Sequence, residues 1–227
     1  MSLNTSAPRR LALIHTVSAL VTSFKTLCAE LVPGVDVFNI VDESLLQDCI
    51  RQGRLSPLTA RRLLGYVISA QQAGADMVMV TCSSMGPAVE MARPLVDIPV
   101  VRVDEPMAEY AVSLGRRIGV AATLSTTLDP TISLIQDRAK TAGKEVEVKW
   151  QLCEGAFEAA LAGDMTRHDS IVGDCLQDLR SRVDVIVLAQ ASMARVAEAL
   201  PEEDRETPML SSPRLAVEHL AKMFGSA

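Results

Sequence analysis

Aromatic residues are scarce in this sequence, and clusters of positive charge are missing. Phenylalanine, tyrosine and tryptophan make up 3% of the 227 residues, which argues against a protein that stacks nucleic-acid bases on aromatic rings. The formal net charge is -6, and lysine and arginine form no cluster. We therefore expect neither a nucleic acid nor an anionic membrane surface as a partner.

Signals for membranes and for cross-links are missing as well. The apolar runs extend over about five to seven residues, whereas a membrane-spanning helix needs about 20. Residues 1–10 contain no apolar segment followed by a cleavage site, so no signal peptide is expected. The five cysteines are scattered without CxxC spacing, which favours neither a zinc site nor a disulfide framework. Free cysteines suit a reducing compartment, so we expect a cytoplasmic protein.

What the sequence does contain is a regular alternation of short apolar runs and longer amphipathic stretches. Strands that alternate with helices are typical of βα units around a parallel sheet, so we predict an α/β fold. Ser56-Pro57 predicts the start of a helix over Leu58–Ala73, and Gly74 is expected as its left-handed C-terminal cap. The eight expected strands are Leu11–His15, Val35–Ile40, Met77–Thr81, Val100–Val101, Ile118–Ala121, Val146–Trp150, Val185–Ala189 and Met209–Leu210.

The second half of the chain repeats the first. Asp76–Met85 (DMVMVTCSSM) and Asp184–Met193 (DVIVLAQASM) share aspartate, serine and methionine at matching positions. Arg10–Ser18 aligns with Arg117–Ser125 at nearly the same spacing. This repeat predicts two similar α/β lobes, each a small parallel sheet flanked by helices, around an approximate two-fold axis with a cleft between them. We expect residues 1–103 and 207–227 to form the first lobe, to which the C-terminal helix returns, and residues 104–206 to form the second.

Cys82 is the first candidate for chemistry because of where it stands. It ends a buried strand, and ligands of open parallel sheets bind at the carboxyl ends of the strands. Ser83, Ser84 and a helix start follow, and the free amides of a helix start attract anions. We expect these amides to favour the thiolate modestly, and a second group to assist. The plain alternative is a buried structural cysteine.

This strand, loop and helix with Thr81-Cys82-Ser83-Ser84 resembles the aspartate/glutamate racemase superfamily, as do Arg117–Thr123 and Glu154–Phe157. The resemblance covers nearly the whole chain. It implies two α/β lobes related by pseudo-two-fold symmetry, an active site in the cleft, neither cofactor nor metal, and a homo-oligomer. It also implies a small carboxylic acid, such as an amino acid, as substrate. Racemases of this group use one cysteine from each lobe to move the proton at the α-carbon.

Carried over by position, Cys82 is the acid/base of the first lobe, and Gln190 stands where the second cysteine belongs. An amide neither takes nor gives a proton near neutral pH, so Gln190 is expected to bind substrate or stabilise an enolate oxygen. His15, after the first strand, is a candidate for the missing base or for a substrate donor; alternatively it hydrogen-bonds its own loop. The expected substrate-binding residues are Thr16, Thr81, Ser83, Ser84, Thr123, Ser125, Ala191 and Ser192.

These residues leave four functions open. The first is a cofactor-independent racemase or isomerase of a small carboxylic acid. The second is a lyase similar to arylmalonate decarboxylase with Cys82 as proton donor, although the family decarboxylase carries its cysteine in the other lobe. The third is a cis-trans isomerase with Cys82 as nucleophile. The fourth is a protein that binds a carboxylate without turnover.

Overall fold

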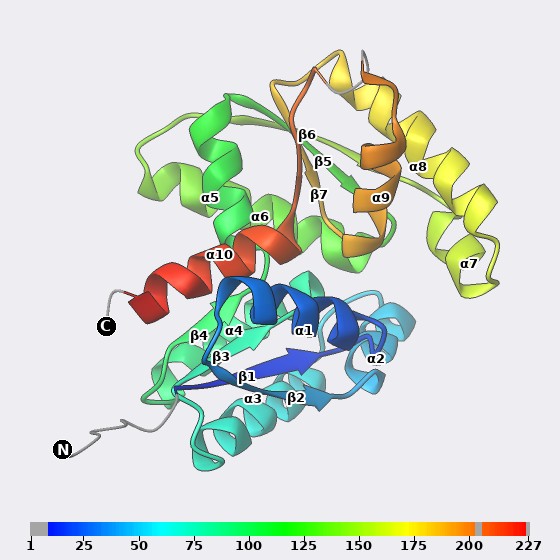
Figure 1. Cartoon of the computed structure of the whole chain (residues 1–227). Helices are drawn as coiled ribbons and strands as arrows, with labels where there is room; N and C mark the ends of the chain where they lie inside the picture. The colour runs from blue at the N-terminus through cyan, green and yellow to red at the C-terminus, as the bar shows by residue number, and fades with distance from the viewer. Residues whose placement is uncertain (1–8, 203–205, 226–227) are drawn as a thin grey trace.

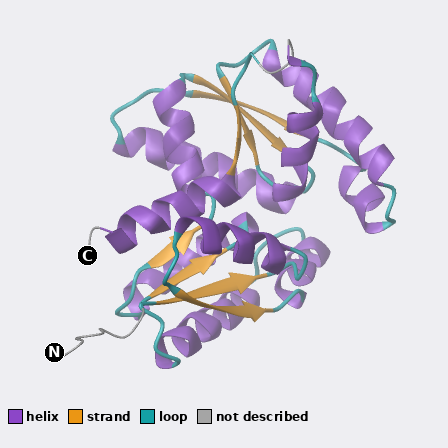
Figure 2. Cartoon of the chain, in the orientation of Figure 1, coloured by secondary structure: helices purple, strands orange, loops and turns teal. Residues whose placement is uncertain are grey.

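A computed structural model of the protein describes residues 9–202 and 206–225. It contains two four-stranded parallel sheets, of order β2-β1-β3-β4 and β6-β5-β7-β8, each between layers of helices (Figure 1, Figure 2). The predicted α/β fold is confirmed, and each expected strand forms. The strands are β1 (Arg10–His15), β2 (Asp36–Val41), β3 (Met77–Val80), β4 (Val100–Arg102), β5 (Arg117–Ala122), β6 (Glu147–Leu152), β7 (Val185–Leu188) and β8 (Met209–Ser211).

The helices begin and end close to the signals in the sequence. At the predicted start of α3, the Ser56 hydroxyl accepts a hydrogen bond from the Thr59 amide at 3.1 Å, and Gly74 after its end has φ of 83°. The helices are α1 (Leu20–Leu31), α2 (Ser44–Gln52), α3 (Pro57–Gln72), α4 (Gly86–Ala92), α5 (Glu105–Leu114), α6 (Ser125–Thr141), α7 (Ala156–Leu161), α8 (Met165–Arg180), α9 (Ala194–Ala199) and α10 (Ser212–Gly225), with short 3-10 turns η1 (Ser83–Met85), η2 (Arg93–Leu95) and η3 (Ala191–Met193).

The repeat in the sequence corresponds to a repeated structural unit. In the first half, the carboxylate of Asp76 before β3 accepts a hydrogen bond from the backbone amide of Arg10 at 2.7 Å. In the second half, Asp184 before β7 accepts the equivalent bond from the amide of Arg117 at 2.9 Å. Each aspartate therefore ties the beginnings of two neighbouring strands together and fixes their register.

The two lobes exchange their last helices. Helix α5 follows the first sheet, but its Met107 and Ala111 are buried in the core of the second. Helix α10 follows the second sheet, and its Val217 and Leu220 are buried in the core of the first, beside α1 (Figure 1). Each lobe therefore contains one helix that follows the sheet of the other lobe.

The expected lobe boundary at residue 207 is wrong for β8. This strand pairs in parallel with β7, and its Leu210 is buried in the second core. The second lobe therefore extends through β8, and the chain crosses back only at α10. Although β8 is short, its parallel pairing with β7 places it in the second sheet.

An ionic cluster holds the crossing from β4 into α5. The carboxylate of Glu105, the first residue of α5, is 2.6 Å from Arg93 of the first lobe and 2.7 Å from Arg138 of α6 in the second. Beside it, Arg102 and Asp104 form a buried pair with two hydrogen bonds, Nε to Oδ1 at 3.0 Å and Nη2 to Oδ2 at 2.9 Å. Such a pair is costly to break because the remaining charge is left buried.

Within the described residues, every helix is too short or too polar to span a membrane.

Gly86, the first residue of α4, has no side chain, and the Arg102 guanidinium occupies the space where one would lie. A Cβ atom at this position would lie 2.3 Å from Nη2 and 2.4 Å from Cζ of Arg102. Arg102 cannot move away freely, because it is buried and held by Asp104. We predict that Gly86→Ala lowers the free energy of unfolding by about 1–3 kcal/mol, measured by urea denaturation.

Gly65→Ala is the matched control. Gly65 lies inside α3, and a Cβ atom there would have no neighbour within 4 Å. The helix-favouring alanine should raise stability by about 0.5–1 kcal/mol. Equal effects of the two substitutions would contradict the close packing of Arg102 against Gly86.

Candidate active site

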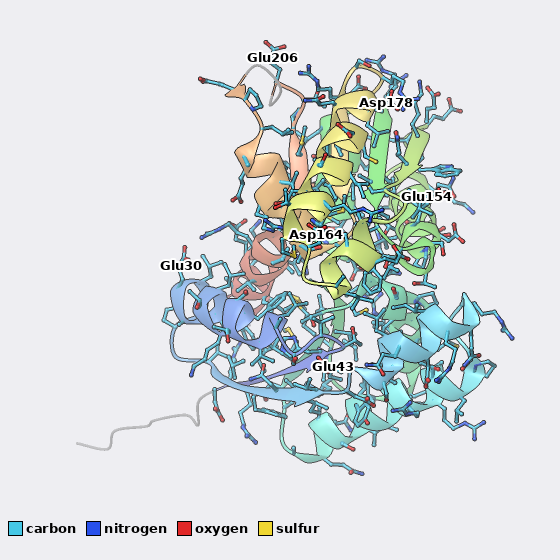
Figure 3. All side chains as sticks on the ribbon, turned by 90° about the vertical axis from the view of Figure 1, so that its right-hand side faces the viewer. Glu30, Glu43, Glu154, Asp164, Asp178 and Glu206 are labelled. Atoms are coloured by element: carbon cyan, nitrogen blue, oxygen red, sulfur yellow. The ribbon has the colours of Figure 1, made fainter. Side chains whose placement is uncertain are left out.

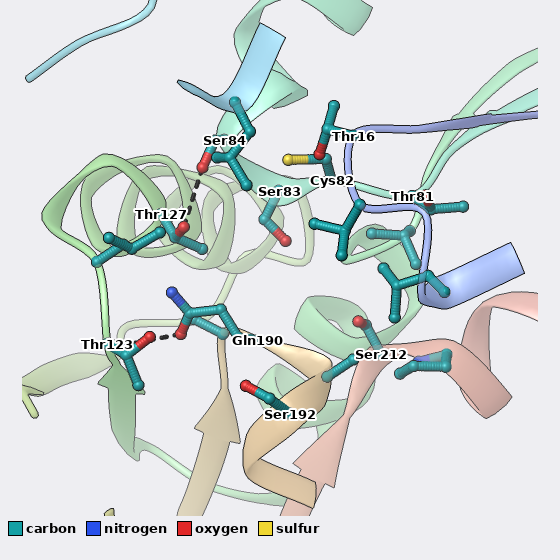
Figure 4. Close-up of a pocket in the computed structure, with 18 of the residues that line it drawn as sticks. Thr16, Thr81, Cys82, Ser83, Ser84, Thr123, Thr127, Gln190, Ser192 and Ser212 are labelled. Carbon is teal, nitrogen blue, oxygen red and sulfur yellow. Dashed lines mark hydrogen bonds between the residues drawn. The ribbon is translucent and has the colours of Figure 1, made fainter. Parts of the chain in front are cut away.

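A pocket of about 230 Å³ lies where the carboxyl ends of the two sheets face each other (Figure 4). Loops after β1, β3 and β4 of the first sheet and after β5, β7 and β8 of the second contribute to its wall. Both lobes are therefore needed to form it, as the repeat predicts. Its polar lining residues are Thr16, Thr81, Cys82, Ser83, Ser84, Thr123, Thr127, Gln190, Ser192 and Ser212.

Cys82 follows β3, and its side chain lies in the first-lobe wall of this pocket. Burial raises the pKa of its thiol above the usual value, while hydrogen bonds from the Thr16 hydroxyl and the amides of Ser84 and Met85 act in the opposite direction. The amides favour the thiolate as expected, and Thr16 acts as an assisting group, but the net direction of the pKa is upward. Loss of hydration outweighs the amides, and Cys82 is a neutral thiol at neutral pH.

Gln190 occupies the equivalent place in the second lobe. Its backbone φ and ψ of −128° and 143° resemble those of Cys82, −133° and 116°, and a 3-10 turn follows each residue. The side-chain oxygen accepts a hydrogen bond from the Thr123 amide at 2.9 Å. This bond sets the orientation of the amide group, with Oε1 beside Thr123 and Nε2 on the side of Thr127 (Figure 4).

The Nε2 atom of Gln190 is buried and has no hydrogen-bond partner among the described residues. An unpaired buried donor costs about 1–3 kcal/mol. A ligand oxygen in the pocket would remove this cost. The atom is therefore a candidate donor to an oxygen acceptor on the second-lobe wall.

One threonine in each lobe holds the residue that follows the third strand. In the first lobe, the Thr16 hydroxyl bonds to the sulfur of Cys82. In the second lobe, the Thr123 backbone bonds to Gln190. The two walls thus share one geometry with different chemistry, a thiol on one side and an amide on the other.

His15 does not line the pocket, so it does not face a substrate there as a base or a donor. The ring is fully buried behind the lining, with Nε2 at 2.9 Å from Oδ1 of Asn39 and Nδ1 at 2.9 Å from Oγ1 of Thr81. Both ring nitrogens are therefore hydrogen-bonded within the first lobe, and the Thr81 hydroxyl also donates to the Ile14 carbonyl oxygen at 3.2 Å. Burial lowers the pKa of His15, which keeps the ring neutral. Its position fits an orienting role for Thr81.

The other expected binding residues line the pocket, with one exception. Thr16, Thr81, Ser83 and Ser84 line the first-lobe wall, and Thr123, Ala191 and Ser192 line the second. Ser125 does not line the pocket. It is exposed at the start of α6, where the helix turns its side chain away and places Thr127 toward the cavity instead.

The sequence did not single out Thr127 or Ser212 as site residues. Thr127 Oγ1 is 2.9 Å from Oγ of Ser84, a hydrogen bond that joins the two lobes across the pocket (Figure 4). Ser212 directly follows β8, so the rule for the carboxyl ends of strands could have found it. The position of Thr127 at the pocket depends on how the two lobes meet. The sequence holds no local signal for that contact.

Two carboxylates that follow strands also lie outside the pocket lining. Glu43 is on the first lobe, where its Oε1 accepts a hydrogen bond from the Ser18 amide at 2.9 Å, and Glu154 is on the second (Figure 3). In the described part of the chain, no three histidine, cysteine, aspartate or glutamate side chains are grouped so that they could hold a metal ion.

Known proteins share both this fold and this sequence pattern. A family model described as Asp/Glu/Hydantoin racemase matches residues 14–220, so the chain belongs to the Asp/Glu/hydantoin racemase family. Racemases are isomerases. No curated protein matches the sequence closely.

Solved structures of racemases resemble the protein over nearly its whole length. Allantoin racemase from Klebsiella pneumoniae has a TM-score of 0.69 and 18% identity over 96% of this chain and 88% of its own. Glutamate racemase RacE1 from Bacillus anthracis has a TM-score of 0.73 and 14% identity, with coverage of 97% and 83%. Aspartate racemase from Picrophilus torridus has a TM-score of 0.70 and 10% identity, with coverage of 96% and 94%. At these identities, the likeness concerns the fold.

Removal of the hydroxyl that bonds to Cys82 should make the thiol harder to ionise. Thr16→Val deletes a donor that stabilises the thiolate, so the pKa of Cys82 rises further and its pH profile of alkylation moves to higher pH. A hydrogen bond of about 1 kcal/mol corresponds to an alkylation rate about fivefold lower at a fixed pH below the pKa. Iodoacetamide labelling of Cys82, followed by mass spectrometry, measures this rate.

Thr123→Val serves as the control because Thr123 donates to Gln190 through its backbone amide, which valine retains. The alkylation profile of Cys82 should stay unchanged in this variant. An unshifted profile in Thr16→Val would contradict the hydrogen bond between Thr16 and the sulfur.

Proposed function

We propose that this protein catalyses cofactor-independent proton transfer at the carbon next to a carboxylate, as a racemase or isomerase of a small carboxylic acid. One observation carries the proposal: Cys82 is the sole side chain with an ionisable proton among the described residues that line the pocket, aside from the weakly acidic hydroxyls. Its sulfur lies in a cavity that both lobes build. Membership of a racemase family supports the same reaction class.

The polar groups around the cavity suit the oxygens of a carboxylate. The unpaired Nε2 of Gln190 offers donor hydrogens from the second lobe, and the hydroxyl groups of Ser83 and Ser84 lie on the opposite wall. When the α-proton leaves, negative charge moves onto the carboxylate oxygens. Donors that are already in place stabilise that charge without further reorganisation.

Cys82 moves the proton on one face of the substrate. Its raised pKa makes the neutral thiol the resting form, so donation of a proton is the step for which it is prepared. The thiolate that results is stabilised by the Thr16 hydroxyl and by the amides of Ser84 and Met85. Removal of a proton by Cys82 requires the thiolate and becomes easier as the pH rises.

A lyase is the second candidate, and the amide at position 190 favours it. Gln190 supplies no proton to the opposite face, whereas a decarboxylase needs a proton on one face only. In that reaction, the bond from the α-carbon to one carboxylate breaks, carbon dioxide leaves with the electron pair remaining on the α-carbon, and the Cys82 thiol protonates that carbon. Water then restores the thiol.

Exchange of the α-proton in heavy water tests the role of Cys82. A panel of small carboxylic acids, with and without amino groups, is incubated with the protein, and loss of the α-proton signal is followed by NMR. We predict exchange for at least one acid and a rate at least about 100-fold lower in Cys82→Ser. Cys175→Ala, on the outer helix α8, should retain the activity.

The same samples separate the two candidates. Racemisation gives both enantiomers without gas release, whereas decarboxylation of a substituted malonate releases carbon dioxide and gives one deuterated enantiomer. Full exchange or full gas release in Cys82→Ser would contradict both candidates.

A further inference from the structure

The pocket combines an apolar wall with uncharged polar groups. Leu20 and Phe24 of α1, Leu46 of α2 and Phe157 of α7 form much of the apolar part. The polar part consists of hydroxyls, the Cys82 thiol and the amide of Gln190. Among the described residues that line it, none is an aspartate, glutamate, lysine, arginine or histidine.

The acidic residues that follow the first-lobe strands are bound to other groups. Asp42 is hydrogen-bonded to Arg62 and to the Tyr66 hydroxyl. Asp104 is fully buried and accepts two hydrogen bonds from Arg102. Both carboxylates are therefore paired with arginines, and Glu43 accepts a hydrogen bond from the Ser18 amide; none of the three lines the cavity.

The pocket offers partners to the carboxylate of an α-amino acid but none to its ammonium group. The carboxylate meets donors, since Nε2 of Gln190 is buried without an acceptor and hydroxyls line the facing wall. The ammonium group would lose water and gain no counter-charge, because Cys82 rests as a neutral thiol and the remaining lining is uncharged. Transfer of an unpaired cation into such a site is unfavourable.

We propose that the substrate is a small organic acid whose reacting carbon carries an apolar group and no ammonium group. The apolar group lies against Leu46 and Phe157, and one carboxylate oxygen accepts from Nε2 of Gln190. The volume of about 230 Å³ limits the substrate to a small molecule. This inference rests on the proposed function, because it names the substrate class of the same pocket.

Matched pairs of acids test the inference directly. Isovalerate and valine share a carbon skeleton and differ by the ammonium group, as do 3-phenylpropionate and phenylalanine. Isothermal titration calorimetry of the intact protein should give at least tenfold tighter binding for the acid without the ammonium group, compared with either enantiomer of the amino acid. Equal or tighter binding of valine and phenylalanine would overturn the inference.

A variant with an added counter-charge tests the reason for the selectivity. Ser192 is exposed and lines the second-lobe wall, so Ser192→Asp places a carboxylate at the cavity with little effect on folding. The ratio of valine to isovalerate affinity should rise at least tenfold in Ser192→Asp and stay unchanged in Ser192→Asn. An unchanged ratio in Ser192→Asp would contradict the electrostatic explanation.

The two proposals fail in different ways. If valine binds tightly and shows exchange that depends on Cys82, the substrate class is wrong and the proposed function stands. If isovalerate binds with the expected preference but no acid undergoes exchange or decarboxylation, the substrate class stands and the proposed function is wrong.

Discussion

The exchange of helices α5 and α10 is the constraint on which the rest of this structure depends. Each helix leaves one sheet and buries apolar side chains in the core of the other, as Met107 does in the second lobe and Leu220 in the first. Full burial of such a side chain stabilises by about 1.5–3 kcal/mol, so the lobes cannot separate without a large loss. With both crossings fixed, the carboxyl ends of the two sheets face one another and enclose a single cavity. Glu105 reinforces this arrangement through arginines from both lobes.

Within that frame, a repeated backbone carries two different side chains. Thr16 and Thr123 hold Cys82 and Gln190 in equivalent places, so the repeat preserves geometry while the chemistry of the two walls diverges. A thiol moves protons, and a primary amide binds oxygen. The asymmetry gives each wall one task. Burial and hydrogen bonding are what shift the pKa of Cys82.

Much of this arrangement could be predicted from the sequence, because it depends on local patterns. Buried strands, helix starts and the polar run after β3 are all visible in the order of residues, and they pointed to Cys82, which lines the pocket. The failures concern contacts between distant segments. The ring nitrogens of His15 hydrogen-bond to Asn39 and Thr81, and the ring is buried away from the cavity. Whether Ser125 or Thr127 faces the pocket depends on how the lobes meet, and the short β8 has no pattern that assigns it to a sheet.

The central claim is that Cys82 faces the reacting carbon while Gln190 holds a carboxylate oxygen. A crystal structure of the protein with bound isovalerate tests it most directly. We predict a carboxylate oxygen within hydrogen-bonding distance of Nε2 of Gln190, about 2.9 Å, with the α-carbon on the side of the Cys82 sulfur. A ligand that lies with its carboxylate away from Gln190, leaving Nε2 unpaired and the sulfur remote from the α-carbon, would contradict it.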